Sequence, residues 1–285
     1  GRNAAGRNNA TGGILIEEGS KDFQVVNSVF RRIRGNAVWT HSLYRSARNG
    51  PGSIADNRFE DIGRDAVQVG HASAVRVERN VGRRIGYPFE EIDVEGGAVP
   101  VGIDTAGNVD RSVYSRNRFE EVNGKCIDLD GFHNGEVRSN VCVNRGAASD
   151  YPSGGYAIVM NNTNPDMRPA GVWIEGNEID GARFGGIFVI GASNRVTGNT
   201  LRNLNLARCT GPSQPGCDYA PDQPDLLRSG IYLGRGAERP APAEDNEIRA
   251  NHISGFRLEN RCVAAAPGVS LARNQVSGNT CRSLP

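Results

Sequence analysis

The chain has 285 residues, of which 37 are glycine and only 6% are aromatic, and its formal net charge at pH 7 is +1. A charge this close to zero excludes the basic footprint that binding to nucleic acid or to an anionic membrane surface requires. No apolar stretch approaches the roughly 20 residues of a membrane span. We therefore expect no nucleic-acid partner and no membrane partner.

Short strands of one kind are predicted along the whole chain. Each begins with a small residue, continues with Ile or Val, and alternates apolar residues with others at the period of two that β-strands show. In chain order, these strands are predicted at 13–16, 37–40, 66–69, 102–105, 126–129, 157–160, 186–189 and 230–233.

Asparagines recur in pairs that are 22 or 23 residues apart, and a period in this range predicts a stacked repeat. Apolar residues precede each asparagine and another follows two places after it, as with Val172, Ile174 and Ile179 around Asn177. We expect each asparagine to take the left-handed turn conformation and to hydrogen-bond to its equivalents in the coils above and below. The pairs are Asn57 and Asn80, Asn117 and Asn140, Asn177 and Asn199, and Asn251 and Asn274.

One coil therefore consists of strand, loop, strand, asparagine turn, strand and loop. The repeated N-x-[FILV] and G-I-x-L patterns resemble the right-handed parallel β-helix of the pectate-lyase-like superfamily, from about Ile14 to about Thr280. Leucine is too scarce for leucine-rich repeats, which have a similar period. The resemblance implies an all-β fold: a single-stranded right-handed parallel β-helix of about eight to ten coils with an asparagine ladder. We expect residues 1–285 to form a single domain that is a mature or trimmed form, because no initial methionine is present.

The six cysteines are even in number, which suits an oxidising compartment and favours a secreted or periplasmic location. Cys209 and Cys217 are predicted to form a disulfide, because they bracket a loop without strand character. Cys262 with Cys281 would close the last coil. Cys126 with Cys142 is a weaker pairing, and buried free thiols are the alternative for these two residues.

Long insertions indicate the binding face. The spacing between asparagines grows to 37 residues at 80–117 and at 140–177, and to 52 residues at 199–251. All of the extra length lies on either side of the G-I-x-L strands, at 41–53, 86–100, 146–155, 162–171, 205–228 and 235–245. Insertions gathered around one strand ladder of a solenoid predict that this ladder is the binding face.

Alternation then predicts which side chains cover that face. With the Ile or Val of each strand pointing inward, the following residue points outward. The predicted outer row is Trp39, Gln68, Asp104, Asp128, Val159, Phe188 and Tyr232, with His41, Asp130 and Asn161 one step further along the same face. Aromatic rings that flank central acids are typical of a groove for a sugar chain, and basic residues are not predicted on this floor except for His41.

Paired aspartates are the candidate catalytic groups. Asp104 and Asp128 lie on neighbouring strands about 4.8 Å apart, and Asp128 and Asp130 are roughly 6.6 Å apart along one strand. Glycosidases use carboxyl separations of about 5 to 5.5 Å or about 6.5 to 9.5 Å, so both pairs are usable. Crowding is expected to raise one pKa of the set. The candidate substrate-binding residues are Trp39, His41, Gln68, His133, Phe188 and Tyr232.

Other interpretations stay open for these residues. Asp130 occurs where turn chemistry alone explains an aspartate, and the outward aromatics have the alternative of being covered by neighbouring loops. The resemblance implies three enzyme classes, namely polygalacturonase-like hydrolases, pectate-lyase-like enzymes and mannuronan epimerases. None of their motifs is met in full, since the chain has D-L-D at 128–130 but no R-I-K, and D-T-A-G at 104–107 in place of D-P-H-D.

We therefore predict a glycoside hydrolase that acts on a polysaccharide or oligosaccharide and requires no cofactor. The alternatives are a noncatalytic glycan-binding or adhesin-type solenoid, and a polysaccharide lyase with Ca²⁺ on Asp104, Asp128 and Asp130. No CxxC or His-Cys cluster suggests zinc. The sugar, the linkage and the oligomeric state are not predicted.

Overall fold

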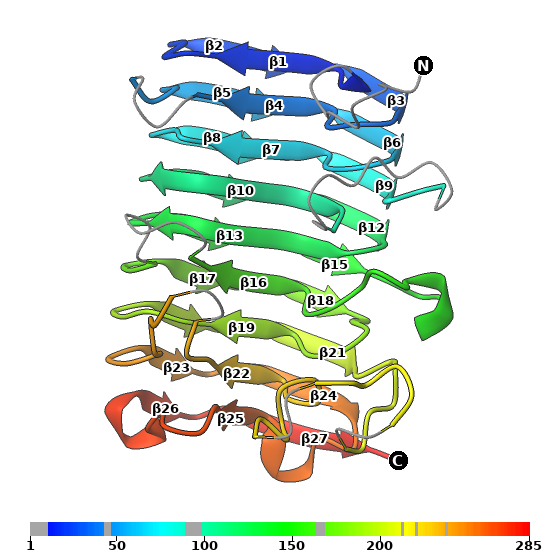
Figure 1. The fold of residues 1–285 in the computed structure, drawn as a ribbon, viewed down its shortest axis with the longest axis vertical. Helices are drawn as coiled ribbons and strands as arrows, with labels where there is room; N and C mark the ends of the chain where they lie inside the picture. The colour runs from blue at the N-terminus through cyan, green and yellow to red at the C-terminus, as the bar shows by residue number, and fades with distance from the viewer. Residues whose placement is uncertain are drawn as a thin grey trace.

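The computed structural model describes residues 11–42, 47–88, 99–162, 169–211, 214–219, 222–236 and 239–285. Three parallel sheets of nine strands each run along the molecule. Figure 1 shows their coils stacked along one long axis, with β1 (Ile14–Glu17) and β27 (Thr280–Leu284) at opposite ends. Each coil contributes one strand to each sheet in the predicted order, so the predicted architecture of eight to ten coils is confirmed.

The sheet that carries the G-I-x-L strands is called sheet A. It contains β1 (Ile14–Glu17), β4 (Val38–His41), β7 (Val67–Gly70), β10 (Val101–Asp110), β13 (Lys125–His133), β16 (Ile158–Asn161), β19 (Ile187–Val189), β22 (Ile231–Leu233) and β25 (Val263–Ala265). All eight predicted strands are present. The ninth, β25, was not predicted because alanines stand where its predecessors have larger aliphatic residues.

Sheet B precedes the asparagine turn in each coil, and sheet C follows it. Sheet B contains β2 (Phe23–Val26), β5 (Gly52–Ala55), β8 (Val75–Glu78), β11 (Val113–Ser115), β14 (Glu136–Arg138), β17 (Trp173–Glu175), β20 (Arg195–Thr197), β23 (Glu247–Arg249) and β26 (Gln275–Ser277). Sheet C contains β3 (Val29–Ile33), β6 (Arg58–Ile62), β9 (Val81–Ile85), β12 (Arg118–Val122), β15 (Val141–Val143), β18 (Glu178–Asp180), β21 (Thr200–Leu204), β24 (His252–Phe256) and β27 (Thr280–Leu284).

The helical elements that lie wholly within the described part of the chain are short 3₁₀ segments. These are η2 (Ala148–Asp150), η3 (Glu259–Arg261) and η4 (Leu271–Arg273), each of which lies in a loop between strands. None of the helices among these described residues has the length and the apolar character that crossing a membrane would need.

The interior is a column of aliphatic side chains. From β4 to β22, the inward Val or Ile of each strand of sheet A is fully buried, and burying each such side chain contributes about 1.5–3 kcal/mol to stability. Because alternation is strict within each strand, turning these residues inward places the next residue of every strand on the outer face. The inward residues of sheet A include Val38, Val67, Ile103, Ile127, Ile158, Ile187 and Ile231.

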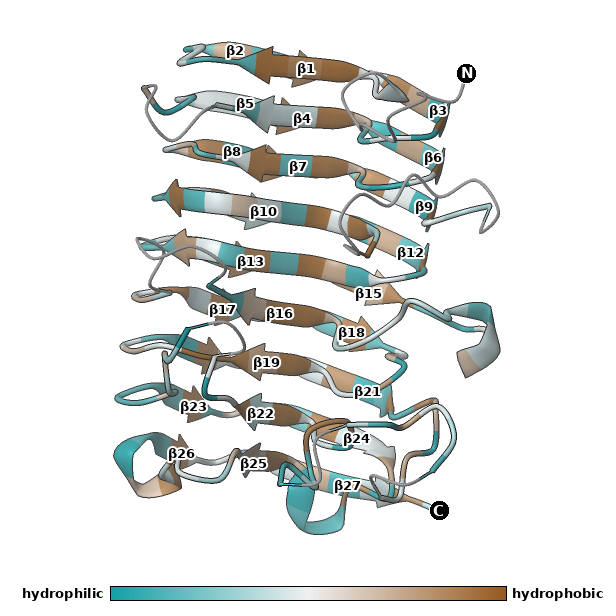
Figure 2. Cartoon of the chain, in the orientation of Figure 1, coloured by the Kyte–Doolittle hydropathy of each residue, from teal (hydrophilic) through white to brown (hydrophobic). Residues whose placement is uncertain are grey.

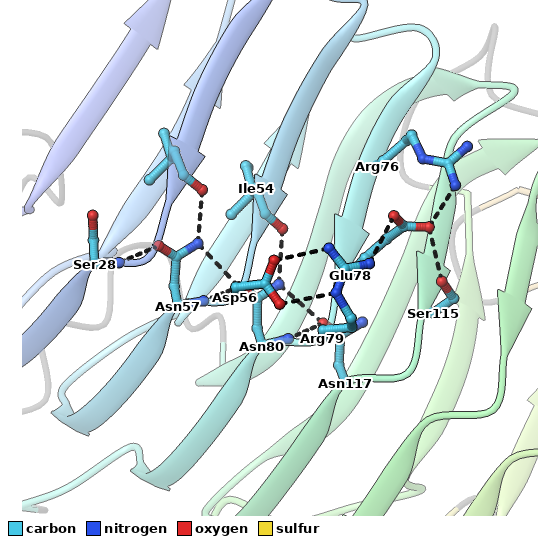
Figure 3. Close-up of polar contacts among 11 residues, drawn as sticks. Ser28, Ile54, Asp56, Asn57, Arg76, Glu78, Arg79, Asn80, Ser115 and Asn117 are labelled. Carbon is cyan, nitrogen blue, oxygen red and sulfur yellow. Dashed lines mark hydrogen bonds and ion pairs between the residues drawn. The ribbon is translucent and has the colours of Figure 1, made fainter.

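The predicted asparagine ladder is present at the turn between sheets B and C (Figure 3). The amide of Asn80 shows the pattern: Nδ2 donates to the Ile54 carbonyl at 2.8 Å and to Asn117 Oδ1 at 3.0 Å, and the Asn80 backbone N–H donates to the same Asn117 oxygen at 3.0 Å. Buried turn amides are thus satisfied by the next coil. The ladder runs through Asn57, Asn80, Asn117, Asn140, Asn177, Asn199, Asn251 and Asn279.

Two details of the predicted ladder are wrong. The left-handed conformation belongs to the residue before each asparagine, for example Asp56 with φ 58° and Arg79 with φ 55°, because that exposed residue makes the turn while the asparagine side chain points to its neighbours. In addition, Asn274 is not the last member of the ladder. It belongs to a second, shorter ladder with Asn194 and Asn246, and Asn279 takes its predicted place.

The error at Asn274 has a clear origin. Val269 and Leu271 imitate the apolar pair that precedes each ladder asparagine, but Leu271 begins η4 and not a strand. The strand that precedes the ladder position is β26, which is followed by Asn279 and then β27. A loop can reproduce the spacing of a strand, and only the hydrogen-bonded register distinguishes the two.

All six cysteines are paired. The predicted Cys209–Cys217 disulfide is confirmed, and Cys126–Cys142 and Cys262–Cys281 are bridged as well. Buried free thiols, the alternative for Cys126 and Cys142, are therefore wrong. The Cys126–Cys142 bridge joins the second residue of β13 to β15 and so links two sheets of one coil.

Removing this bridge is expected to destabilise the protein. The double variant Cys126→Ala/Cys142→Ala should lose about 3 kcal/mol of unfolding free energy, because the 16-residue separation closes a loop in the unfolded chain. Urea unfolding followed by circular dichroism measures the change. An unchanged midpoint in the double variant would contradict this prediction, and reducing agent should destabilise the wild type at least as much.

Candidate functional site

The predicted outer row of sheet A is confirmed. Pairing between neighbouring strands aligns Trp39 with Gln68, Gln68 with Asp104, and Asp104 with Asp128. The row continues from Asp128 through Val159, Phe188 and Tyr232 in direct register. Figure 2 shows hydrophilic segments within β7, β10 and β13, whereas β1 and β19 are hydrophobic along most of their length. The polar part of the row is therefore confined to three consecutive coils.

Asp130 lies in the next outward row of the same face. It pairs with Ala106 on β10 and with Asn161 on β16. His41 occupies the same face near the N-terminal end, where its Nδ1 lies 3.6 Å from Glu17 Oε1 and its ring meets the edge of Trp39 at 4.8 Å. The structure thus brings Asp104 and Asp128 into direct register, with Asp130 two residues further along β13, whereas His41 lies on β4, three strands away from β13 in the sheet.

The long insertions flank this sheet, as predicted. Figure 1 shows loops on both sides of the sheet A strands, leading out to sheet B on one side and back from sheet C on the other. Residues 43–46, 89–98, 163–168, 212–213, 220–221 and 237–238 of these insertions lie outside the described residues. In the described parts, Arg183 donates to the Tyr151 carbonyl at 3.1 Å and ties the 146–155 loop to the neighbouring coil.

Asp104 occupies a buried position within the row. The residue is 7% exposed, and Gln68 Nε2 donates to its Oδ2 at 2.7 Å. Burial raises the pKa of Asp104 well above its ordinary value, and the nearby carboxyls of Asp65 and Asp128 add to this effect against the opposing cations of Arg64 and Lys125. The expectation that crowding raises one pKa of the set therefore agrees with the structure, with burial as the larger cause.

Asp128 has a different environment. Leu129 N–H and Asn161 Nδ2 donate to its Oδ1, each at 3.1 Å, and the Lys125 ammonium contacts its Oδ2. Two hydrogen-bond donors and one cation therefore surround this carboxyl group. The two neighbouring acids thus have different surroundings. Asp104 is buried next to other acids, and Asp128 is paired with a cation.

Three charged residues of this site were missed. Asp65 is fully buried, and its Oδ1 accepts hydrogen bonds from Val101 N–H at 3.0 Å and from Arg64 Nε at 3.2 Å. Burial raises the pKa of Asp65 to about 6, with Arg64 opposing the shift. Burial also lowers the pKa of Lys125, but Asp128, with smaller contributions from Asp104 and Asp130, opposes this effect and the pKa is raised overall.

These residues were missed because they precede the predicted strand segments at 66–69 and 126–129. Lys125, the first residue of β13, precedes Asp128 by three residues, so alternation at a period of two does not place it beside that outward side chain. Lys125 is therefore a basic residue that contacts the floor without belonging to the predicted outer row. One signal was available: Lys21 and Lys125 are the two lysines among 33 basic residues, so a lysine beside the aspartate pair stands out from the arginine background.

The aromatic end of the row is covered. Tyr232 is fully buried, its hydroxyl donates to Gln223 Oε1 at 3.2 Å, and its ring stacks on Phe188 at a centroid distance of 5.8 Å. Tyr156 packs edge-on against Phe188 and donates to the Leu226 carbonyl at 2.6 Å. A ligand cannot contact Tyr232 in this arrangement, so the alternative of coverage by a loop holds for this residue, while Trp39 and Phe188 stay half-exposed.

His133 belongs to a separate polar cluster. Its Nε2 lies 3.7 Å from Asp110 Oδ1, and its Nδ1 is 3.1 Å from the Gly131 carbonyl. Asp110 also accepts from Asn134 Nδ2 at 3.0 Å and pairs with Arg111 at 2.9 Å. This cluster forms where β10 and β13 continue past the other strands of sheet A, and it places His133 beside Asp110.

Calcium binding stays a prediction. Within the ranges that the structure describes, no group of three His, Cys, Asp or Glu side chains is arranged to hold a metal ion. The Lys125 ammonium occupies one oxygen of Asp128, a position that a Ca²⁺ ion on the same carboxylate would have to share.

The chain is similar to one family model and to solved structures of other proteins. A family model described as "Right handed beta helix region" matches residues 8–203 and 101–284. No curated protein matches the chain. Among solved structures, the chain is similar to the catalytic unit of thermostable GH87 alpha-1,3-glucanase from Streptomyces thermodiastaticus strain HF3-3, with 15% identity and a TM-score of 0.49. It is also similar to the Agl-KA catalytic domain, with 10% identity and a TM-score of 0.50.

These two likenesses cover 95% and 93% of this chain, but 48% and 47% of the other two. The chain therefore spans about half the length of these structures. At such low identity, the likeness concerns the fold alone.

Proposed function

This chain belongs to the right-handed β-helix family, and we propose that it binds a polysaccharide along the outer face of sheet A and hydrolyses a glycosidic bond there. Asp104 acts as the general acid, and Asp128 acts as its ionised partner. The observation that supports this proposal most directly is that two carboxyls in direct register on neighbouring strands have different surroundings. Asp104 is buried, and Asp128 is paired with Lys125. One protonated acid next to one ionised carboxylate is what glycoside hydrolysis needs.

The roles follow from the surroundings of each carboxyl. Burial keeps the proton on Asp104, which donates it to the oxygen of the leaving sugar. Lys125 and Asn161 hold Asp128 as a carboxylate, which either attacks the anomeric carbon or activates a water. Trp39, next but one to Asp104 in the row, offers a half-exposed ring for stacking on a sugar. Asp130, two residues after Asp128 on β13, is a third carboxylate on the same face.

The lyase alternative is less well supported. A lyase needs a base that removes a proton from the sugar ring, and Lys125 is the basic side chain that contacts Asp128. The ion pair with Asp128 raises the pKa of Lys125, so this amine keeps its proton and is a poor base. A noncatalytic glycan-binding solenoid is the second candidate, and the low exposure of Asp104 and Asp128, 7% each, favours it.

A secreted or periplasmic location is part of this proposal. Three disulfides are stable in an oxidising compartment and are rare in the cytosol. A polysaccharide too large to enter a cell would be met in the same place.

The function is tested by incubating the intact protein with a panel of neutral and acidic polysaccharides, with and without EDTA. We expect new reducing ends without any ultraviolet absorbance from unsaturated products, and no effect of the chelator. Proton NMR of the first product identifies the role of Asp128: retained anomeric configuration makes it the nucleophile, and inverted configuration makes it the base for water. Unsaturated products that disappear with EDTA would support the lyase, and binding without any cleavage would support the noncatalytic solenoid.

A further inference from the structure

Gln68 was expected to contact sugar, but its side chain is nearly buried and both ends of its amide are engaged. It is 7% exposed. Its Oε1 accepts from Asn36 Nδ2 at 2.5 Å, and its Nε2 donates to Asp104 Oδ2 at 2.7 Å. Asn36, Gln68 and Asp104 come from three consecutive coils, and we call this set of hydrogen bonds the amide relay.

The direction of the amide relay is determined by the backbone. The N–H of Asp65 can only donate, and its partner is Asn36 Oδ1 at 3.3 Å. Asn36 must therefore present its Nδ2 to Gln68, which makes the contacted Gln68 atom the acceptor Oε1. It follows that Gln68 presents Nε2 to Asp104, so that Asp104 Oδ2 receives a hydrogen and does not carry one toward Gln68.

We propose that the amide relay positions the catalytic acid, with Gln68 directing the proton of neutral Asp104 to Oδ1. Gln68 is thus a positioning residue and not a sugar ligand. The proposal rests on the proposed function for its consequence in catalysis, but the placement of the proton is a property of the resting protein. Among the described residues, no other side-chain hydrogen bond reaches the carboxyl of Asp104.

The consequence for the reaction is specific. In the first step, the Oδ1–H bond of Asp104 breaks and a bond forms between that hydrogen and the glycosidic oxygen. The electron pair of the breaking C–O bond goes to the leaving sugar, and the anomeric carbon bonds to Asp128 or to the water that Asp128 activates. Asp104 becomes a carboxylate, and the Gln68 N–H on Oδ2 then stabilises its new negative charge. The amide relay therefore both aims the acid and makes its ionised form less costly.

The test compares Gln68→Met, which removes the donor to Asp104, and Gln68→Glu, which keeps the shape of the side chain. The titration of Asp104 is followed by ¹³C NMR of protein with labelled aspartate, with its resonance assigned by its absence in Asp104→Asn. We expect the titration midpoint of Asp104 to rise by about one pH unit in Gln68→Met, because a hydrogen bond to the charged form of Asp104 is lost. Gln68→Glu should raise it as well, since a second carboxyl replaces the donor.

Kinetics provide the second measurement. In Gln68→Met, kcat should fall while KM stays within about twofold, and the basic limb of the pH profile should move up by about as much as the NMR midpoint. Gln275→Met, on the exposed β26 of sheet B, is the matched control and should change neither quantity. An unchanged Asp104 midpoint in both Gln68 variants, or a rise in KM alone, would overturn the proposal and return Gln68 to the sugar-binding residues.

The two proposals fail in different ways. If the Asp104 midpoint rises in the Gln68 variants but the wild type cleaves no polysaccharide, the amide relay stands and the proposed hydrolysis is wrong. If the wild type is an active hydrolase but the midpoint does not move, the hydrolysis stands and the amide relay is wrong. Should Gln68→Met not fold, Gln68→Glu gives the same distinction.

Discussion

Asp104→Asn and Asp128→Asn are each expected to reduce kcat/KM on the polysaccharide that the protein cleaves by about 10²- to 10⁴-fold. Both substitutions keep the size of the side chain, and an asparagine at position 104 can still accept the hydrogen bond from Gln68. The loss should therefore come from chemistry and not from unfolding. Rates of reducing-end release, with circular dichroism as the check on folding, measure the effect.

The two variants should differ in their response to the leaving group. An aryl glycoside with an acidic phenol needs little help from a general acid, so Asp104→Asn should recover much of its rate on that substrate. Asp128→Asn should not recover, because its missing carboxylate acts at the anomeric carbon or on water. Asp180→Asn, on β18 of sheet C, is the matched control and should be fully active.

The pH profile provides a further check on Asp104. A general acid works while it is protonated, so activity is present below its pKa and is lost as the pH rises through it. Because burial raises the pKa of Asp104, the wild type should stay active to a higher pH than an ordinary aspartic acid would allow. This basic limb should be absent in Asp104→Asn. Activity that survives either substitution unchanged would contradict the catalytic assignment.

Asn117→Ala is expected to lower the unfolding free energy by about 3–6 kcal/mol. The Asn117 amide donates to the Val77 carbonyl at 2.8 Å and to Asn140 Oδ1 at 2.9 Å, and its Oδ1 accepts two hydrogen bonds from Asn80 at 3.0 Å. All of these groups are buried. Alanine would leave several of them without partners, and each such group costs about 1–3 kcal/mol, with water entering the gap to recover part of the loss.

The same substitution at the last member of the ladder is the matched control. Asn279 accepts two hydrogen bonds from Asn251 and its Nδ2 donates to the Ile248 carbonyl at 2.9 Å, but it is partly exposed and donates to no further ladder asparagine among the described residues. Water can replace its hydrogen bonds, so Asn279→Ala should cost only about 1 kcal/mol. Urea unfolding of both variants measures the difference. Equal losses at the two positions would show that burial does not set the strength of the ladder.

The strand order and the facing of sheet A could be predicted from local patterns. Alternation at a period of two predicts which residue of a strand points inward, and the sequence repeat predicts that the coils stack. Together they placed Trp39, Gln68, Asp104 and Asp128 in one row, which the pairing of β4, β7, β10 and β13 confirms. A local rule sufficed because each strand carries its own inward Val or Ile.

Contacts made at the corners and by the loops could not be predicted in this way. Tyr232 is covered by the loop that carries Gln223, and His133 is joined to Asp110 on the neighbouring strand. Asn274 resembled a ladder residue because Val269 and Leu271 reproduce the spacing of a strand. In each case, the deciding partner lies outside the repeat pattern or in another coil.

The sequence by itself determined the solenoid and the side of it that carries the acids, because both follow from periodicity that every coil repeats. Only the tertiary structure decided how those acids differ. Asp104 meets Gln68, 36 residues earlier, and Asp128 meets Asn161, 33 residues later. Residues so distant become neighbours because adjacent coils lie about 4.8 Å apart, and burial in that stack then sets which carboxyl keeps its proton.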